Sequence, residues 1–153
     1  MTGARTAVLA TVSSDSHGWN LAYLGLVLGE AGYAVDSLGP CSAVADVLDA
    51  VRARRPRLVV LSTVNGHGAI EAPAYARALR ALPDGGRLVL VLGGNLSPGG
   101  ALSADRRAAL ESAGFDAVFT DAEPDAVERF RALIAALPAD GDVAETAGRG
   151  RAG

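Results

Sequence analysis

Apolar and polar positions alternate along the chain in blocks that predict strands and helices in turn. Five short runs rich in valine, leucine and alanine have the length of buried strands, and a segment with helical spacing of apolar residues follows each one. In the second of these segments, Val44, Val47, Leu48 and Val51 fall on one helix face. The predicted strands are Thr6–Val12, Tyr33–Leu38, Leu58–Ser62, Leu88–Leu92 and Ala117–Thr120.

The predicted helices complete a regular order of strand and helix. Continuous apolar strands are typical of a parallel sheet covered on both faces, and right-handed crossovers place the covering helices there. The pattern predicts an α/β, flavodoxin-like fold: a doubly wound five-stranded parallel sheet with helices on both faces, a three-layer sandwich. The helices are Trp19–Ala31, a segment that Ser42 caps and that ends before Pro56, Ala72–Leu82, Ser103–Ala113 and Pro124–Leu137.

Length and composition fit one domain followed by a tail. The chain has 153 residues, of which 50% are apolar, and this is enough for a sizeable core. After Pro138 the composition changes to alanine, glycine, aspartate, glutamate and arginine. We therefore expect a domain over residues 1–137 and a disordered tail over residues 138–153.

Charge and cysteine content exclude several kinds of partner. The net charge is −3 and the 14 basic residues are scattered, so we expect no nucleic-acid partner. The longest apolar stretch, Leu21–Leu28, is much shorter than the roughly 20 residues that cross a bilayer, so we expect no membrane span. Cys41 is the single cysteine and the N-terminus shows no leader pattern, which favours a cytoplasmic location. Cys41 is expected to be a packing residue.

The candidate chemistry lies in the polar stretch Ser14–Asn20, between the first predicted strand and the first predicted helix. Ligands of open α/β sheets bind at the carboxyl ends of the strands. There, His17 could coordinate a metal through one ring nitrogen while the other hydrogen-bonds to the carboxylate of Asp15. The same residue types also build turns and helix caps, and on this stretch alone a capping loop is the favoured interpretation.

Two further predicted loops open at the same edge of the sheet, and they favour a ligand site over a capping loop. They are Ser62–Gly68 after the third strand and Gly93–Gly100 after the fourth, and both are rich in glycine and small polar residues. Glycine lets a bulky ligand approach the backbone, and hydroxyl groups supply hydrogen bonds. The sequence has no phosphate-loop lysine, dinucleotide fingerprint, acidic magnesium cluster or serine-hydrolase elbow at these loops. Together the loops predict a long, deep slot.

Two features leave alternatives open. Gly25 and Gly29 lie four residues apart on the first predicted helix, which fits either close helix–sheet packing or a ligand tail along the helix. His67, between two glycines, is expected to be a loop residue rather than a metal ligand.

The three loops resemble the cobalamin-binding domain family, which carbon-skeleton mutases and methionine synthase share. The resemblance rests on Asp15-x-His17, on Ser62 with Gly66-x-Gly68, and on Gly93-Gly94, and it extends over residues 5 to about 137. Within the family, the chain is most similar to the small subunits of glutamate (methylaspartate) mutases, which share its Ser-Asp-x-His opening. It departs from the family pattern at Asn20 in place of a glycine, at Asn65 in place of a tyrosine, and at Ala122-Glu123 in place of Gly-Thr.

The resemblance implies adenosylcobalamin as cofactor, bound base-off with its dimethylbenzimidazole tail in the slot. His17 would be the lower axial cobalt ligand and Asp15 would orient it, while Ser62 would hydrogen-bond the tail base. No catalytic side chain is expected in this chain. The cofactor-binding residues are predicted to be Ser14, Asp15, Ser16, His17, Gly18, Ser62, Val64, Gly66, Gly68, Gly93, Gly94 and Asn95, with His17 as the metal ligand.

The resemblance also implies a function and a partner. The chain would be the cofactor-carrying subunit of an adenosylcobalamin-dependent isomerase, a carbon-skeleton mutase similar to glutamate mutase, in which homolysis of the cobalt–carbon bond starts radical chemistry. A separate large subunit, a barrel in the family, would hold the substrate, and the two would form a heterotetramer. Two alternatives stay open: a corrinoid carrier or methyl-transfer module, and a non-catalytic cobalamin-binding sensor domain.

Overall fold

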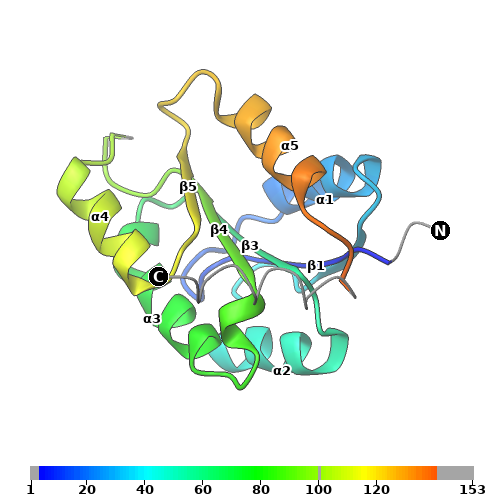
Figure 1. Cartoon of the computed structure of the whole chain (residues 1–153). Coiled ribbons are helices and arrows are strands. Elements are labelled where there is room, and N and C mark those ends of the chain that lie inside the picture. The colour runs from blue at the N-terminus through cyan, green and yellow to red at the C-terminus, as the bar shows by residue number, and fades with distance from the viewer. Residues whose placement is uncertain (1–3, 100, 141–153) are drawn as a thin grey trace, which may run out of the picture.

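The computed structural model describes residues 4–99 and 101–140 and has the three layers that the sequence predicts (Figure 1). All strand pairs are parallel, and the strand order is β2-β1-β3-β4-β5. This is the doubly wound, flavodoxin-like order, with its switch point between β1 and β3. The strands are β1 (Thr6–Ala10), β2 (Ala34–Ser37), β3 (Leu58–Thr63), β4 (Val89–Gly94) and β5 (Ala117–Thr120).

Helices cover both faces of the sheet, as predicted (Figure 1). Along β3, successive side chains point to opposite faces, so Val59 and Leu61 join one core cluster while Leu58 and Val60 join the other. The first cluster packs against α2, α3 and α4, and the second against α1 and α5. The helices are α1 (Trp19–Glu30), α2 (Val44–Arg54), α3 (Gly68–Arg80), α4 (Ala104–Ala113) and α5 (Ala126–Ala136), with a short 3-10 helix η1 (Gly85–Arg87).

The start of α3 differs from the prediction. The helix begins at Gly68, four residues before the predicted Ala72. The sequence of this segment contains Gly66, Gly68 and Pro73, which are typical of a loop. In the structure, a contact with a distant part of the chain supports the first turn of α3. The Ala69 N–H donates to the Leu96 carbonyl, with an N···O distance of 2.9 Å. This hydrogen bond comes from the loop after β4, so no local pattern predicts it.

The prediction that Ser42 caps α2 is wrong. The N-cap residue is Ala43, whose backbone N–H donates to the Asp46 carboxylate at 3.2 Å. The Ser42 hydroxyl instead donates to the Gly39 carbonyl at 2.8 Å. Ser42 therefore stabilises the turn before the helix, because Gly39 turns the chain back at a positive φ of 80°.

The end of the described chain is hydrogen-bonded to the sheet. The Asp140 N–H donates to the Ala4 carbonyl at 2.9 Å, and the Thr6 N–H donates to the Asp140 carboxylate at 3.2 Å. Residues 138–140 thus pack beside the start of β1, whereas residues 141–153 of the predicted tail lie outside the described residues. Within residues 4–99 and 101–140, no helix is long and apolar enough to cross a membrane.

Candidate functional site

The loop after β1 carries a buried carboxylate. Asp15 follows a turn in which its N–H donates to the Val12 carbonyl at 3.0 Å, and its own carbonyl accepts from the Cys41 N–H at 2.8 Å. The Asp15 residue is only 1% exposed although it lies in a loop. A buried carboxylate is costly unless several donors surround it, so its partners define the site.

Four hydrogen bonds converge on the Asp15 carboxylate. Oδ1 accepts from the backbone N–H of His17 at 3.0 Å and lies 2.7 Å from His17 Nδ1. Oδ2 accepts from the Thr63 hydroxyl at 2.8 Å and from the Val64 N–H at 2.7 Å. Burial raises the pKa of Asp15, but these four hydrogen bonds outweigh it and hold the pKa well below its usual range. Asp15 therefore stays ionised and ties the β1 loop to the end of β3.

The same contact determines which nitrogen of His17 is available. An ionised carboxylate can only accept, so Nδ1 carries the proton and donates it to Asp15. In the neutral ring this leaves a lone pair on Nε2, which has no hydrogen-bond partner in the described part of the chain, and the His17 side chain is 50% exposed. A histidine held in one tautomer by a carboxylate is the usual arrangement of a metal-ligating imidazole.

A second network supports the loop from α3. The Ser13 hydroxyl donates to the Glu71 carboxylate at 3.1 Å, and the Ser14 hydroxyl donates to the same carboxylate. The Asn65 amide donates to the Ser14 hydroxyl at 2.8 Å. Ser14 is thus a supporting residue of the loop, whereas Glu71 and Thr63 are site residues that sequence reasoning missed. Glu71 lies 57 residues from Ser14 in the chain, so no spacing rule could identify it.

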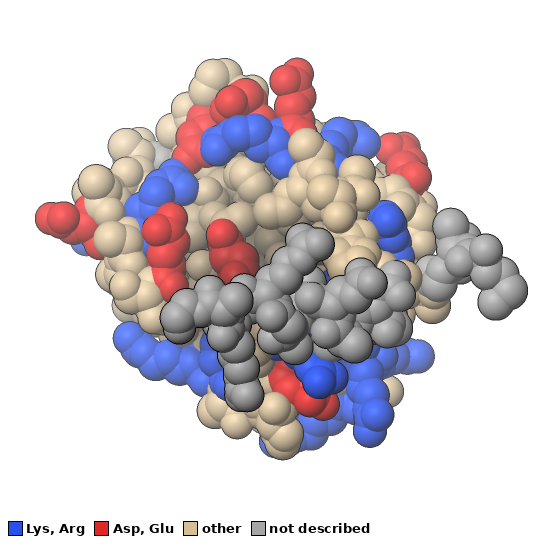
Figure 2. Space-filling view, viewed as in Figure 1, with Lys and Arg blue, Asp and Glu red and all other residues tan. Residues whose placement is uncertain are grey.

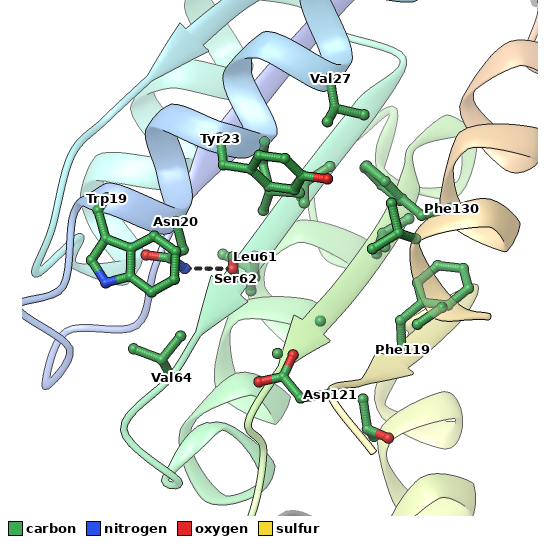
Figure 3. Close-up of a pocket in the computed structure, with 18 residues that line it drawn as sticks. Trp19, Asn20, Tyr23, Val27, Leu61, Ser62, Val64, Phe119, Asp121 and Phe130 are labelled. Carbon is green, nitrogen blue, oxygen red and sulfur yellow. Dashed lines mark hydrogen bonds between the residues drawn. The ribbon is translucent and has the colours of Figure 1, made fainter. Parts of the chain in front are cut away.

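A largely apolar slot of about 280 Å³ opens between α1 and α5, above the carboxyl ends of β3, β4 and β5 (Figure 3). Its walls include the side chains of Val27, Phe119 and Phe130, and Trp19 and Tyr23 lie at its exposed rim. Phe119 and Phe130 meet edge to face, with ring centroids 6.0 Å apart. Such a slot suits a flat, mostly apolar ligand with few polar groups.

Among the polar residues that line the slot, Asn20 and Ser62 form a hydrogen-bonded pair. The Asn20 amide nitrogen donates to the Ser62 hydroxyl oxygen at 2.7 Å (Figure 3). The Asn20 amide oxygen is buried and has no partner among the described residues. A buried unpaired acceptor costs free energy, and this oxygen has almost no accessible surface, so it does not face the slot.

The structure divides the predicted site residues into three groups. Ser62, Val64, Gly93 and Gly94 line the slot. Ser14, Asp15, Ser16, His17 and Gly18 form the loop that Asp15 joins to Val64. Gly66, Gly68 and Asn95 lie outside the slot lining.

The third group, Gly66, Gly68 and Asn95, connects the loop after β3 to the loop after β4. The Gly66 N–H donates to the Asn95 carbonyl at 3.2 Å, and the Asn95 N–H donates to the Thr63 carbonyl at 2.9 Å. A Cβ at Gly68 would overlap the Thr63 methyl group and lie 2.9 Å from Leu96 Cδ2. Gly68 is therefore needed for close packing. All three residues support the site from outside the slot, by holding Thr63 and the two loops together.

The contacts around Gly25 and Gly29 support neither explanation of the α1 glycines. A Cβ at Gly25 would lie 4.0 Å from Leu9 Cδ2, which is an ordinary contact, and one at Gly29 would meet nothing within 4 Å. Neither glycine lines the slot, which α1 borders through Trp19, Asn20 and Tyr23 among others. Trp19, which is 72% exposed, is a slot residue that the sequence analysis did not predict.

Charged side chains surround this region without forming one large patch of either sign. On the face seen in Figure 2, acidic and basic side chains are interspersed around the edge, and uncharged residues occupy much of the centre of the upper half. One example lies beside the slot, where Glu123 pairs with both Arg107 and Arg129.

The fold and the histidine loop define a class of α/β ligand-carrying domains, and comparison with known families gives its identity. The model of the B12 binding domain matches residues 5–123, so the chain belongs to the B12 binding domain family. This confirms the resemblance found in the sequence.

Two curated relatives narrow the comparison. The chain is 32% identical over 130 residues to glutamate mutase sigma subunit 1 of Haloarcula marismortui, covering 84% of this chain and 83% of the relative. It is 31% identical over 140 residues to the glutamate mutase sigma subunit of Halobacterium salinarum, covering 92% and 89%. Among solved structures, a cobalamin-binding protein from Desulfitobacterium hafniense has the same fold, with a TM-score of 0.66, 22% identity, and coverage of 84% of this chain and 57% of that one.

Proposed function

We propose that this chain is the cofactor-carrying subunit of an adenosylcobalamin-dependent carbon-skeleton mutase that resembles glutamate (methylaspartate) mutase. The observation that carries the proposal is the Asp15–His17 pair, which engages Nδ1 and leaves Nε2 of the half-exposed His17 side chain without a partner among the described residues. The similarity to two glutamate mutase sigma subunits supports the mutase rather than another corrinoid protein.

The residues present fit a base-off cobalamin in two respects. Neutral imidazole is a suitable nitrogen ligand for a transition metal such as cobalt, and the carboxylate of Asp15 orients the ring. The slot is lined mainly by apolar and aromatic side chains, which suits the planar dimethylbenzimidazole tail. His17 would hold the metal from below, and the slot would hold the tail.

Each element of the site then has a defined task. Asp15 keeps the His17 ring in one tautomer and orientation, and Ser62 offers its hydroxyl proton to a ring nitrogen of the tail base. Gly93 and Gly94 line the slot through their backbone. Bound cobalamin would supply the radical chemistry of the rearrangement, and this chain would supply binding and orientation.

The proposal includes a partner and a location. The loops 14–20, 62–68 and 93–100 contain no arginine that could hold a dicarboxylate, and we propose that a large barrel subunit binds the substrate and covers the upper face of the cofactor in a cytoplasmic heterotetramer. We also propose residues 1–137 as the cofactor-binding domain and residues 138–153 as a tail without a role in the site. The isolated chain is then expected to bind cofactor but to have no mutase activity.

Isotope labelling tests the axial ligand directly. The protein is labelled with ¹⁵N-histidine, reduced cob(II)alamin is added, and the electron paramagnetic resonance spectrum is recorded. Coordination by His17 predicts that the nitrogen superhyperfine splitting changes from the three-line pattern of ¹⁴N to the two-line pattern of ¹⁵N. His67→Ala is the matched control and keeps this response, whereas His17→Ala loses it.

Two results would reject the assignment. One is a spectrum that ¹⁵N-histidine leaves unchanged, because the benzimidazole nitrogen would then still hold the metal. The other is identical behaviour of wild type and His17→Ala. Adding a large glutamate mutase subunit and assaying amino-acid rearrangement against methyl transfer then separates the mutase from a corrinoid carrier, and activity with neither points to a sensor domain.

A further inference from the structure

A second pocket, of about 460 Å³, opens at the edge of the sheet opposite the histidine loop. It lies where α2 and α3 end and where β3 and β4 begin, and it shares no lining residue with the slot. β3 has six residues at about 3.3 Å each, so the two pockets lie roughly 15–20 Å apart along the strands. The proposed cobalamin site therefore does not use this second pocket.

The lining of the second pocket is positively charged. Its acidic residues are Asp84 and Asp140, and its basic residues are Arg52, Arg55, Arg57 and Arg87. Four arginines against two aspartates leave a formal charge of +2. Positive charge beside the last turn of a helix complements the helix dipole, which explains Arg52 at the end of α2. It does not explain Arg57, which lies beyond the helix.

Arg57 is a buried cation. It is only 5% exposed and directly precedes β3, where its backbone carbonyl accepts from the Val89 N–H at 2.8 Å. Its Nη2 atom donates to the Ala139 carbonyl at 3.0 Å, and no ion pair joins Arg57 to a carboxylate within residues 4–99 and 101–140. A buried charge is costly unless it is paired, so the position of Arg57 calls for an anion.

The guanidinium of Arg57 has donors left for that anion. Nε and Nη1 have no hydrogen-bond partner among the described residues, and neither is one of the fully buried unpaired atoms, so both retain accessible surface. The two carboxylates of the lining are engaged elsewhere. Asp140 accepts from the Thr6 N–H at 3.2 Å, and Asp84 lies 3.9 Å from Arg87 at the protein surface. The pocket thus presents free guanidinium donors and an unbalanced positive charge.

We propose that this second pocket binds a small organic phosphate monoester. A planar guanidinium matches the oxygens of a phosphoryl group with two parallel hydrogen bonds, and Arg57 would make this contact. A phosphate monoester carries nearly two negative charges at pH 7, which balances the lining, whereas a single carboxylate does not. The carbon part of the ligand would pack on Pro56, Leu82 and Leu88. This inference goes beyond the proposed function and does not depend on it.

Calorimetric titration with phenyl phosphate tests the ligand class. We expect one phenyl phosphate per chain, with an affinity that falls as salt is added. Inorganic phosphate lacks the apolar ring and benzoate lacks the second charge, so each should bind about 10-fold more weakly. Phenol, which has the ring and no charge, should not bind. Benzoate or phenol binding as tightly as phenyl phosphate would overturn the proposal, as would the absence of phenyl phosphate binding.

Substitutions of three arginines locate the site. Arg57→Gln should weaken phenyl phosphate binding by about 10–100-fold, because it removes charge-assisted hydrogen bonds. Arg55→Gln removes an exposed charge of the lining and should weaken binding by about 3-fold. Arg54→Gln is the matched control, since Arg54 lies on α2 beside Arg55 but pairs with Asp36 outside the pocket. It should bind phenyl phosphate as the wild type does.

Thermal unfolding shows whether each variant is folded, and the comparison of the two exposed arginines decides if Arg57→Gln is not. Wild-type affinity in folded Arg57→Gln would overturn the proposal. Where Arg57→Gln does not fold, equal affinities of Arg55→Gln and Arg54→Gln would overturn it.

A competition experiment separates this pocket from the cobalamin site. Saturating hydroxocobalamin should leave the affinity for phenyl phosphate unchanged, because the slot lies at the other ends of the strands. Displacement of phenyl phosphate by hydroxocobalamin would show that it binds in the slot, and would overturn the proposal. His17→Ala should bind phenyl phosphate normally, so loss of cobalt ligation and loss of phosphate binding are distinguishable.

Discussion

Replacement of Asp15 by asparagine tests the central contact of the site. The side chain keeps its shape, but one acceptor oxygen becomes an N–H₂ donor and the charge is lost. In the wild type, each carboxylate oxygen accepts one hydrogen bond from a backbone N–H and one from a side chain, with His17 on Oδ1 and Thr63 and Val64 on Oδ2. Asp15→Asn therefore places a donor against two donors, whichever way the amide turns.

The loss of folding free energy in Asp15→Asn depends on which hydrogen-bond partners can change between donor and acceptor. The Thr63 hydroxyl can rotate and accept, and the imidazole can exchange its proton, but the backbone N–H groups of His17 and Val64 cannot. One buried backbone donor is lost in either orientation, along with the charge that strengthened the others, which costs about 3 kcal/mol. That is a large part of the roughly 5–15 kcal/mol that holds a domain of this size folded.

Cofactor affinity is expected to fall as well. If the amide N–H₂ faces the ring, Nδ1 becomes the acceptor and the proton moves to Nε2, which then has no lone pair for a metal. Loss of such a supporting carboxylate lowers affinity by about 10–100-fold. The stability effect and the binding effect thus arise from the same pair of oxygens.

Urea unfolding followed by circular dichroism measures the first effect, and titration with hydroxocobalamin measures the second. Asp121→Asn is the control for stability, since Asp121 is an exposed carboxylate at the same edge of the sheet and accepts no hydrogen bond among the described residues. It should unfold as the wild type does. An Asp15→Asn variant with wild-type stability, or with wild-type affinity for hydroxocobalamin, would refute the role given to Asp15.

Two other predictions concern the structure around the site. The Tyr75 hydroxyl accepts from the Ser13 N–H at 2.9 Å and donates to the Ser42 carbonyl at 2.5 Å, so Tyr75→Phe should cost about 1–3 kcal/mol in urea unfolding, and a wild-type midpoint would contradict this. Burial raises the pKa of Tyr75, so the folded protein keeps a proton that the unfolded chain releases above about pH 10. The contribution of the Tyr75 hydroxyl to the free energy of unfolding therefore falls as the pH rises above about 10, and Tyr75→Phe should remove this fall. A Cβ at Gly94, which has a φ of 113°, would overlap the Thr63 carbonyl, whereas a Cβ at Gly29 would meet open space. Gly94→Ala should therefore lower the free energy of unfolding by at least about 2 kcal/mol, and Gly29→Ala should raise it by about 1 kcal/mol. Melting temperatures that shift in the same direction for both alanine variants would contradict the packing described here.

The order of strands and helices and the place of the histidine loop could be predicted from the sequence, because short-range patterns determine them. Continuous apolar runs such as that of β3 identify buried parallel strands, and alternating strands and helices permit few topologies. Asp15 and His17 are two residues apart, so their pairing is a local event that spacing alone can indicate. The family resemblance then identified the class of ligand.

Only the tertiary structure decided what surrounds that pair. Thr63 reaches Asp15 across 48 residues, and Ser62 reaches Asn20 across 42, because β3 lies beside β1 and α1 packs over both. Hydrophobic periodicity reports which face of an element is buried, but it does not report which polar atoms meet at the strand ends. Ser42 shows the consequence: its sequence position favours a helix cap, but the fold places its hydroxyl on the Gly39 carbonyl. The pattern of apolar residues thus determined the scaffold, while hydrogen bonds between distant loops determined the site.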